Sequence, residues 1–244
     1  MSWALDNLDL VWELTLHHIR LSIVPIVLAF VLAIPLGWIA NRNKTSRAIV
    51  VTTGSLLYTI PSLPLFVILP VIIGTRVLDE TNLVVALLIY GVALMMRSAT
   101  DALGSVDATV LQAADAMGYS AWARFWRVEL PLAGPVLLAG IRVVSVSTIA
   151  LVSVGIIIGS RNLGYLFQDG KQRDILAEVG TGIVASLLIA LVFDLIIVLL
   201  GRLTLPWTRS DAKRSGSRGS SSQGSDDEAL REDPVVATYG EQQR

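Results

Sequence analysis

The candidate functional residues of this sequence fall in three places. Asp194 interrupts an otherwise apolar run. A 45-residue stretch, 97–141, contains small apolar residues at helical spacing. Residues that could line a polar path occur in or beside other apolar runs; these are Tyr58, Pro61, Ser62, Thr148 and Ser153. Small apolar residues at helical spacing form a stripe of the kind that a groove on a partner can accept.

The motifs of common enzymes are absent from the sequence. There is no G-x-x-x-x-G-K-[ST] loop to cradle phosphates, so we expect that the chain itself binds no ATP. The sequence also lacks Cys, H-E-x-x-H and G-x-S-x-G, and its apolar runs hold no paired metal ligands. These absences argue against an intramembrane hydrolase, and we predict no catalytic residues, no metal site and no cofactor bound by this chain.

Composition places the chain in a membrane. Of its 244 residues, 53% are hydrophobic and 16% charged, against about 25% charged in an average soluble domain. Residues 209–244 hold 13 of the 39 charged side chains, so the remainder is poorer still. The net charge of −1 argues against a nucleic-acid partner, which would need a basic surface. These features predict an integral protein of a lipid bilayer.

The windows that are poor in charge predict an all-α membrane fold with five spanning helices. We expect the spans at about 21–41, 50–73, 81–97, 143–160 and 179–201. The first window alone would give about 30 Å of helix, which is the thickness of the bilayer core. Pro61, Pro64 and Pro70 fall in the second window, so that helix should be kinked or broken.

Lys and Arg residues in the short connections indicate the orientation. The connection after the first span carries Arg42, Lys44 and Arg47, and the 97–142 region carries four arginines. Both are expected on the cytoplasmic side, with residues 1–16 outside and the C-terminus inside. Residues 207–244 are rich in Ser, Gly and charge, so they are expected to form a disordered cytoplasmic tail. The localisation implied is the cell membrane.

The 97–141 stretch is too long for a simple connection. Asp107 can cap a short helix that Gly118 ends, and Ser120 can cap a second helix that Pro131 stops. Spacing places Val110, Ala113, Ala114 and Met117 on one apolar stripe of the first helix. The second helix groups Trp122, Phe125 and Trp126 beside Arg124 and Arg127, a combination that suits the lipid headgroup layer.

This stretch resembles the EAA loop of the permease subunits of bacterial ABC importers. The match consists of Gln112-Ala113-Ala114, then Gly118, Val128 and Leu130-Pro131 at the family's spacing, within 107–131. Gln112 stands where the family usually has Glu, and Val128 where it usually has Ile. The resemblance implies a type I ABC importer transmembrane domain over 17–206. It also implies that the short helix is a coupling helix, with Val110, Gln112, Ala113, Ala114, Met117, Gly118, Leu130 and Pro131 in the loop that meets an ATPase.

The resemblance also implies partners. ATP and Mg would be bound by separate ATPase subunits, a second permease, identical or paralogous, would complete the pathway, and an extracytoplasmic binding protein would deliver substrate. Segments 58–63, 87–102 and 159–166 resemble the permeases for glycine betaine, choline, carnitine and related osmoprotectants. Methionine permeases share the layout and remain an alternative. Two alternatives come from other functional classes. One is a secondary transporter, and the other is a non-transporting sensor or scaffold that works through its tail.

Several residues have two interpretations. Pro61 and Ser62 could line the pathway or form a packing kink. The hydroxyl residues of the fourth span could line a polar path or allow close helix packing. Asp194 is expected to pair with Arg142 or Arg97 rather than to contact substrate, because an unpaired charge inside a bilayer is costly. The adjacent His17 and His18 are expected at the outer membrane interface, not in a metal site or pH sensor.

Overall fold

The computed structural model describes residues 2–206, so the predicted tail at 207–244 lies outside the described residues. Every regular element in 2–206 is helical. The elements are α1 (Ser2–Asp6), α2 (Leu8–Ala40), α3 (Lys44–Thr59), α4 (Ser62–Ile73), α5 (Glu80–Gly104), α6 (Ala108–Ala116), α7 (Ala121–Arg124), the π-helical η1 (Phe125–Glu129), α8 (Leu130–Val152), the 3-10 helix η2 (Ser153–Ile158), α9 (Gly164–Gln172) and α10 (Leu176–Thr204). The contacts described below lie within one compact unit that ends at Leu203.

Four helical runs are long and apolar enough to cross a membrane, and a bent pair makes a fifth. The runs are Leu8–Ala40, Glu80–Gly104, Ala121–Ile158 and Leu176–Thr204, and the pair is α3 with α4. The all-α fold and its five apolar segments are therefore as predicted. Most helices extend beyond the charge-free windows, because charged residues at the ends of a span continue the helix into water.

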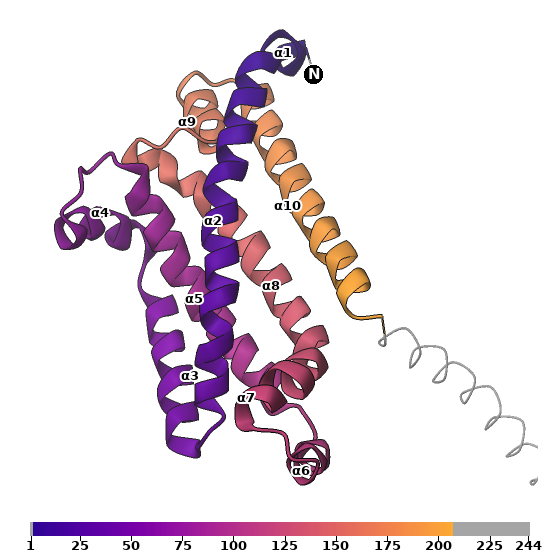
Figure 1. Ribbon diagram of the computed structural model, residues 1–244. Coiled ribbons are helices and arrows are strands. Elements are labelled where there is room, and N and C mark those ends of the chain that lie inside the picture. The colour runs from indigo at the N-terminus through magenta and orange to yellow at the C-terminus, as the bar shows by residue number, and fades with distance from the viewer. Residues whose placement is uncertain (1, 207–244) are drawn as a thin grey trace, which may run out of the picture. The chain divides into compact units, whose positions relative to one another are not determined.

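The second predicted span is broken, as its prolines suggested. The axes of α3 and α4 differ by 101° across Ile60 and Pro61, and Figure 1 shows α4 turned away from α3. Pro61 precedes the first residue of α4 with an extended backbone, at φ −63° and ψ 135°. Pro64 lies in the first turn of α4, where no amide donor is needed. Pro70 lies inside α4 without ending it, so only Pro61 of the three breaks the helix.

The core lies where α2 crosses α5, and α5 in turn packs on α8. Two glycines make the first crossing close. A Cβ atom added at Gly37 would lie 2.8 Å from the backbone carbon of Ala99, and one at Gly91 would lie 2.8 Å from the Cβ of Ala29. Without a hydrophobic effect between helices in lipid, small residues at such crossings allow the packing that holds the helices together.

The prediction that Pro131 stops a helix is wrong. The chain runs helically from Ala121 to Ile158, and η1 supplies a wider π turn just before this proline, in which Leu130 N–H donates to Phe125 O. A proline in an α-helix clashes with the carbonyl four residues earlier and leaves it unpaired. The π turn shifts the hydrogen bonds by one residue, so the helix continues through Pro131.

His18 also departs from its expected place at the membrane interface. It is fully buried, and its Nε2 lies 3.0 Å from Ile149 O, so the ring joins α2 to α8. The neighbouring His17 is only half-buried, with Nδ1 2.8 Å from Arg161 O. Adjacent residues on a helix point about 100° apart, which is why one ring is buried and the other is not.

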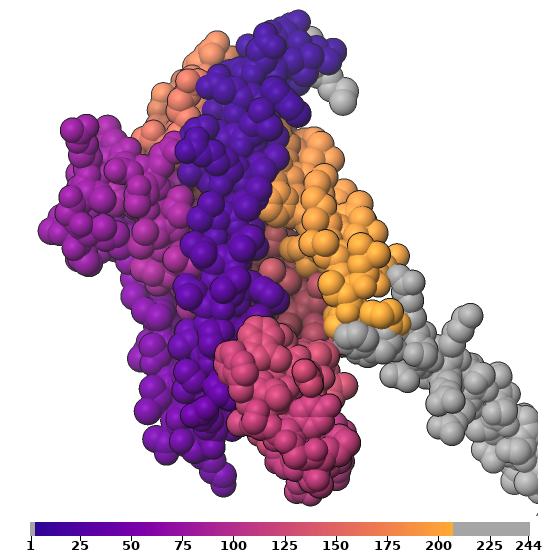
Figure 2. Space-filling view, viewed as in Figure 1, coloured from indigo at the N-terminus to yellow at the C-terminus, as the bar shows by residue number. Residues whose placement is uncertain are grey.

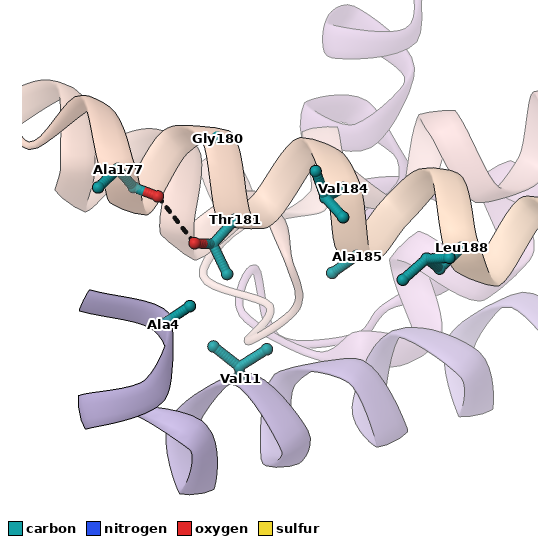
Figure 3. A pocket seen from close by; sticks show the side chains of 8 residues that line it. All are labelled: Ala4, Val11, Ala177, Gly180, Thr181, Val184, Ala185 and Leu188. Carbon is teal, nitrogen blue, oxygen red and sulfur yellow. Dashed lines mark hydrogen bonds between the residues drawn. The ribbon is translucent and has the colours of Figure 1, made fainter. Parts of the chain in front are cut away.

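An apolar pocket of about 430 Å³ separates the start of α10 from α1 and α2 (Figure 3). It is lined by Ala4, Val11, Ala177, Gly180, Thr181, Val184, Ala185 and Leu188. The one hydroxyl of this lining, Thr181 Oγ1, donates to Ala177 O at 2.7 Å. The lining thus presents no free side-chain donor to a polar ligand. Beyond the pocket, α10 remains largely exposed within the single chain (Figure 2).

Candidate coupling surface and polar residues of the spans

The helix α6 begins at a strong cap. Asp107 accepts hydrogen bonds from the backbone N–H and the hydroxyl of Thr109, both at 2.8 Å. These bonds favour the ionised carboxylate, so they lower the pKa of Asp107. The negative charge also lies at the positive end of the helix dipole. The sequence prediction of a cap at Asp107 is confirmed, and α6 has a fixed starting point.

The other end of α6 is closed by Gly118. Gly118 N–H donates to Asp115 O at 3.0 Å, and Tyr119 N–H donates to Ala114 O at 3.2 Å. This pair of bonds is the Schellman motif, which needs a left-handed residue after the helix. Gly118 has φ +83° and nothing within 4 Å of where a Cβ atom would be, so its conformation, rather than a lack of space, favours glycine.

Three of the four residues in the predicted stripe are exposed. Val110 and Ala113 lie on the surface, and Met117 is 70% exposed, whereas Ala114 is 1% exposed and packs inward. Gln112 is exposed as well. The short helix therefore presents a small apolar surface with an amide beside it, and Ala114 anchors the helix to the rest of the chain.

Leu130 and Pro131 lie elsewhere. Both are half-buried at the start of α8, where Leu130 packs against the cluster around Phe125 and Ala133. The two ends of the EAA-like pattern thus have different roles within this chain. The Gln112–Gly118 end provides the exposed surface, and the Leu130-Pro131 end continues the helix into the core.

Arg124 connects α6 to the helix that enters the core, a role that the sequence pattern did not indicate. Its Nη1 lies 2.6 Å from Asp115 at the end of α6, and its Nε donates to Glu129 Oε1 at 2.8 Å. The Glu129 side chain is only 8% exposed. The hydrogen bond from Arg124 to Glu129 and the bonds to Asp115 raise the pKa of this guanidinium. The five-residue spacing between Arg124 and Glu129 is closed by the π turn. The nine-residue spacing to Asp115 matches no helical repeat, so only the turn between α6 and α7 brings that pair together.

The break between α3 and α4 is held by a tyrosine. Tyr90 of α5 donates its hydroxyl hydrogen to Ile60 O, the carbonyl that the break leaves without a helical partner. Tyr58 lies edge-on to Tyr90, with ring centroids 6.1 Å apart, and is 46% exposed. Pro61 is exposed and Ser62 is half-buried. The break is thus fixed in place, with Tyr58 and Pro61 on the surface of the single chain.

The hydroxyl residues of the fourth span are buried or half-buried. Thr148 is 3% exposed and packs within the chain, which favours a packing role. Ser153, half-buried, marks the point where α8 gives way to the 3-10 helix η2. Among residues 2–206, no group of three or more His, Cys, Asp or Glu side chains is arranged to hold a metal ion.

Asp194 pairs with Arg142, one of the two partners considered. Arg142 donates from Nε and Nη2 to the two carboxylate oxygens, with the second distance 2.9 Å. This two-point contact joins α8 to α10, which otherwise makes few contacts within the described chain. The pair neutralises two charges that lie on helices of membrane-spanning length, and two parallel bonds also fix its geometry.

Removing one member of this pair should therefore cost more than removing both. We expect Arg142→Met and Asp194→Leu each to lower the Tm of the purified protein by several degrees, because each leaves a charge without its partner. The double variant should recover most of that loss. Thermal unfolding of all four proteins in one detergent checks this, and a double variant as unstable as the summed singles would contradict it.

The geometry is that of a helical membrane domain with a braced, exposed helix outside its spans. The chain belongs to the family of binding-protein-dependent transport system inner membrane components, whose model matches residues 14–210. It is thus a membrane-spanning permease subunit of an ABC importer.

The names of similar proteins specify a substrate, which the family description does not. The osmoprotectant import permease protein OsmW of Salmonella typhimurium is 30% identical over 195 residues, which cover 79% of this chain and 90% of OsmW. The carnitine transport permease protein OpuCD of Listeria monocytogenes is 29% identical over 170 residues, covering 70% of this chain and 73% of the relative. A solved chain of the MetNI methionine ABC transporter, in an inward-facing conformation, matches 82% of this chain and 98% of its own length with a TM-score of 0.71 and 20% identity. That likeness confirms the type I fold.

Proposed function

We propose that this permease imports glycine betaine or another quaternary-amine osmoprotectant, and that α6 transmits the closure of an ATPase subunit to the spans. The exposed apolar stripe of α6, capped at both ends and braced by Arg124, is the observation that carries the coupling role. It offers a rigid convex element of the kind that a groove on another subunit can accept. The names of the osmoprotectant and carnitine relatives support the substrate class.

The proposal includes an arrangement in the membrane and a set of partners. The α6 end of the spans would face the cytoplasm, because Arg42, Lys44 and Arg47 cluster there, and the N-terminus would lie outside. ATPase subunits would hold ATP and Mg, a second permease would complete the pathway, and a binding protein would dock at the α9 end. Tyr58 and Pro61, exposed at the break, are the residues that we propose for the pathway.

Gly118→Asp tests the coupling role. A side chain in the left-handed conformation is strained, and here it would also place a charge on the docking surface. We expect ATP-driven uptake into proteoliposomes to fall at least 10-fold, while membrane insertion stays normal. Gly74→Asp is the matched control, because Gly74 has φ +77° and equally open surroundings at the other end of the spans.

Normal uptake by Gly118→Asp, or equal loss in both variants, would overturn the coupling role. The substrate class is tested separately, by measuring the affinity of the cognate binding protein for glycine betaine, choline, carnitine and methionine. Tight binding of methionine alone would favour an amino-acid importer. Uptake that persists without any ATPase and follows an ion gradient would identify a secondary transporter instead.

A further inference from the structure

Three tryptophans gather where α7 and η1 meet the end of α2. Trp38 lies near the last turn of α2, with its ring centroid 6.2 Å from that of Trp122, and Trp122 lies 5.6 Å from Trp126. The buried ring of Phe125 packs beneath them, 5.3 Å from Trp38. Trp122 and Trp126 nevertheless remain 62% and 48% exposed. The packing therefore presents two large amphipathic rings outward in a fixed arrangement.

These rings lie at the level where a membrane span ends. The apolar run of α2 closes with the exposed Ile39 and with Ala40, and the next residues are Asn41-Arg42-Asn43-Lys44. Figure 2 shows the α6–α7 segment against this lower end of α2. Tryptophan favours the boundary between hydrocarbon and headgroups, because its ring is apolar and its N–H is polar. A cluster at the end of a span would lie at the depth of the lipid headgroups.

Some of the cations around the cluster have carboxylate partners and others do not. Two neighbouring arginines have carboxylate partners, since Arg47 pairs with Asp101 at 2.7 Å and Arg124 with Asp115 and Glu129. Within the described part of the chain, by contrast, Arg42, Lys44 and Arg127 form no ion pair. Arg42 instead stacks on Trp38, with Cζ 4.3 Å from the ring centroid. Stacking uses the face of a guanidinium and leaves its in-plane N–H donors free for an anion.

We infer that Trp38, Arg42, Trp122, Trp126 and Arg127 form an aromatic and basic patch that binds the headgroup of an anionic phospholipid. The phosphate would be held by Arg42 and Arg127, and the indoles would lie between the headgroup and the upper acyl chains. The exposed stripe of α6 is a separate surface, formed by Val110, Ala113 and Met117. Placing the patch in the cytoplasmic leaflet rests on the proposed function, whereas lipid binding itself does not.

Titration of the full-length chain with phosphatidylglycerol, followed by native mass spectrometry, tests this inference. Each basic residue near an anionic surface contributes about fivefold in affinity. Arg42→Gln with Arg127→Gln should therefore weaken phosphatidylglycerol binding roughly 25-fold and leave phosphatidylcholine binding unchanged. Lys171→Gln with Arg173→Gln, which removes the same charge at the other end, should change neither. Arg42→Lys with Arg127→Lys keeps both charges and should retain most of the phosphatidylglycerol affinity. This variant replaces the Gln variant in the titration if the Gln variant does not fold.

Three results would overturn the inference. Unchanged phosphatidylglycerol affinity in the Gln variant would exclude headgroup recognition by this patch. An equal loss of both lipids would show that the two arginines do not select an anionic headgroup. Loss of ATPase co-purification with unchanged lipid affinity would identify the patch as a subunit contact. Because lipid binding is measured on the chain alone, the result is independent of whether the chain couples to an ATPase or imports an osmoprotectant.

Discussion

Gly37→Val should prevent most of the protein from folding. The new Cβ would meet Ala99 and Thr100 within 2.8–2.9 Å, and two of these contacts are to backbone atoms that cannot rotate away. Overpacking typically costs about 1–3 kcal/mol, and we expect the upper end of that range because α2 and α5 would have to separate. The measurements are the yield of monodisperse protein and its Tm.

Gly180→Val is the control for this variant. Gly180 also lies within a long apolar helix, but nothing approaches within 4 Å of where its Cβ would be. Its replacement should change stability by about 0.5 kcal/mol or less. If Gly37→Val behaved like Gly180→Val, the close crossing of α2 and α5 would not be what holds these helices together.

Arg124→Met should separate ATP hydrolysis from transport. Glu129 would lose its partner while its side chain is only 8% exposed, and α6 would lose its link through Asp115. We expect a loss of about 2 kcal/mol in stability, below the roughly 3–5 kcal/mol for a fully buried pair because the Arg124 side chain is 24% exposed. Substrate transported per ATP hydrolysed should fall at least 10-fold in a reconstituted complex.

Arg173→Met removes a comparable arginine pair without touching α6. Arg173 binds Asp169 at 3.0 Å, its side chain is 58% exposed, and the pair spans one helical turn at the opposite end. That variant should keep both its stability and its ratio of transport to hydrolysis. An unchanged ratio in Arg124→Met would show that α6 does not depend on this link.

Much of the fold could be predicted because a membrane helix is recognisable from its local sequence, as a long apolar run without charge. Runs without charge gave the five apolar segments, and the caps of α6 at Asp107 and Gly118 follow from single residues with strong conformational preferences. The break at Pro61 was predictable, but not that Pro64 and Pro70 would be accommodated. Their effect depends on where the helix restarts, and Tyr90 from another helix helps to hold that point.

The remaining features depend on contacts between residues far apart in the chain. The burial of His18 requires Ile149 O to be nearby, and the contact of Arg124 with Asp115 requires a turn that no repeat predicts. The continuation through Pro131 depends on a π turn, which has no clear sequence signal. Asp194 was different, because a charge within an apolar run must find a partner, and few arginines were available at the same depth.

The π turn at Phe125–Glu129 has a mechanical consequence. It makes one helical rod from Ala121 to Ile158, which is roughly 55 Å long and so exceeds the bilayer core by about 25 Å. Arg124 fastens α6 to the protruding end, and η2 forms the far end. Under the proposed coupling role, this run would act as a lever, because a small tilt applied at α6 would displace its opposite end near Ser153.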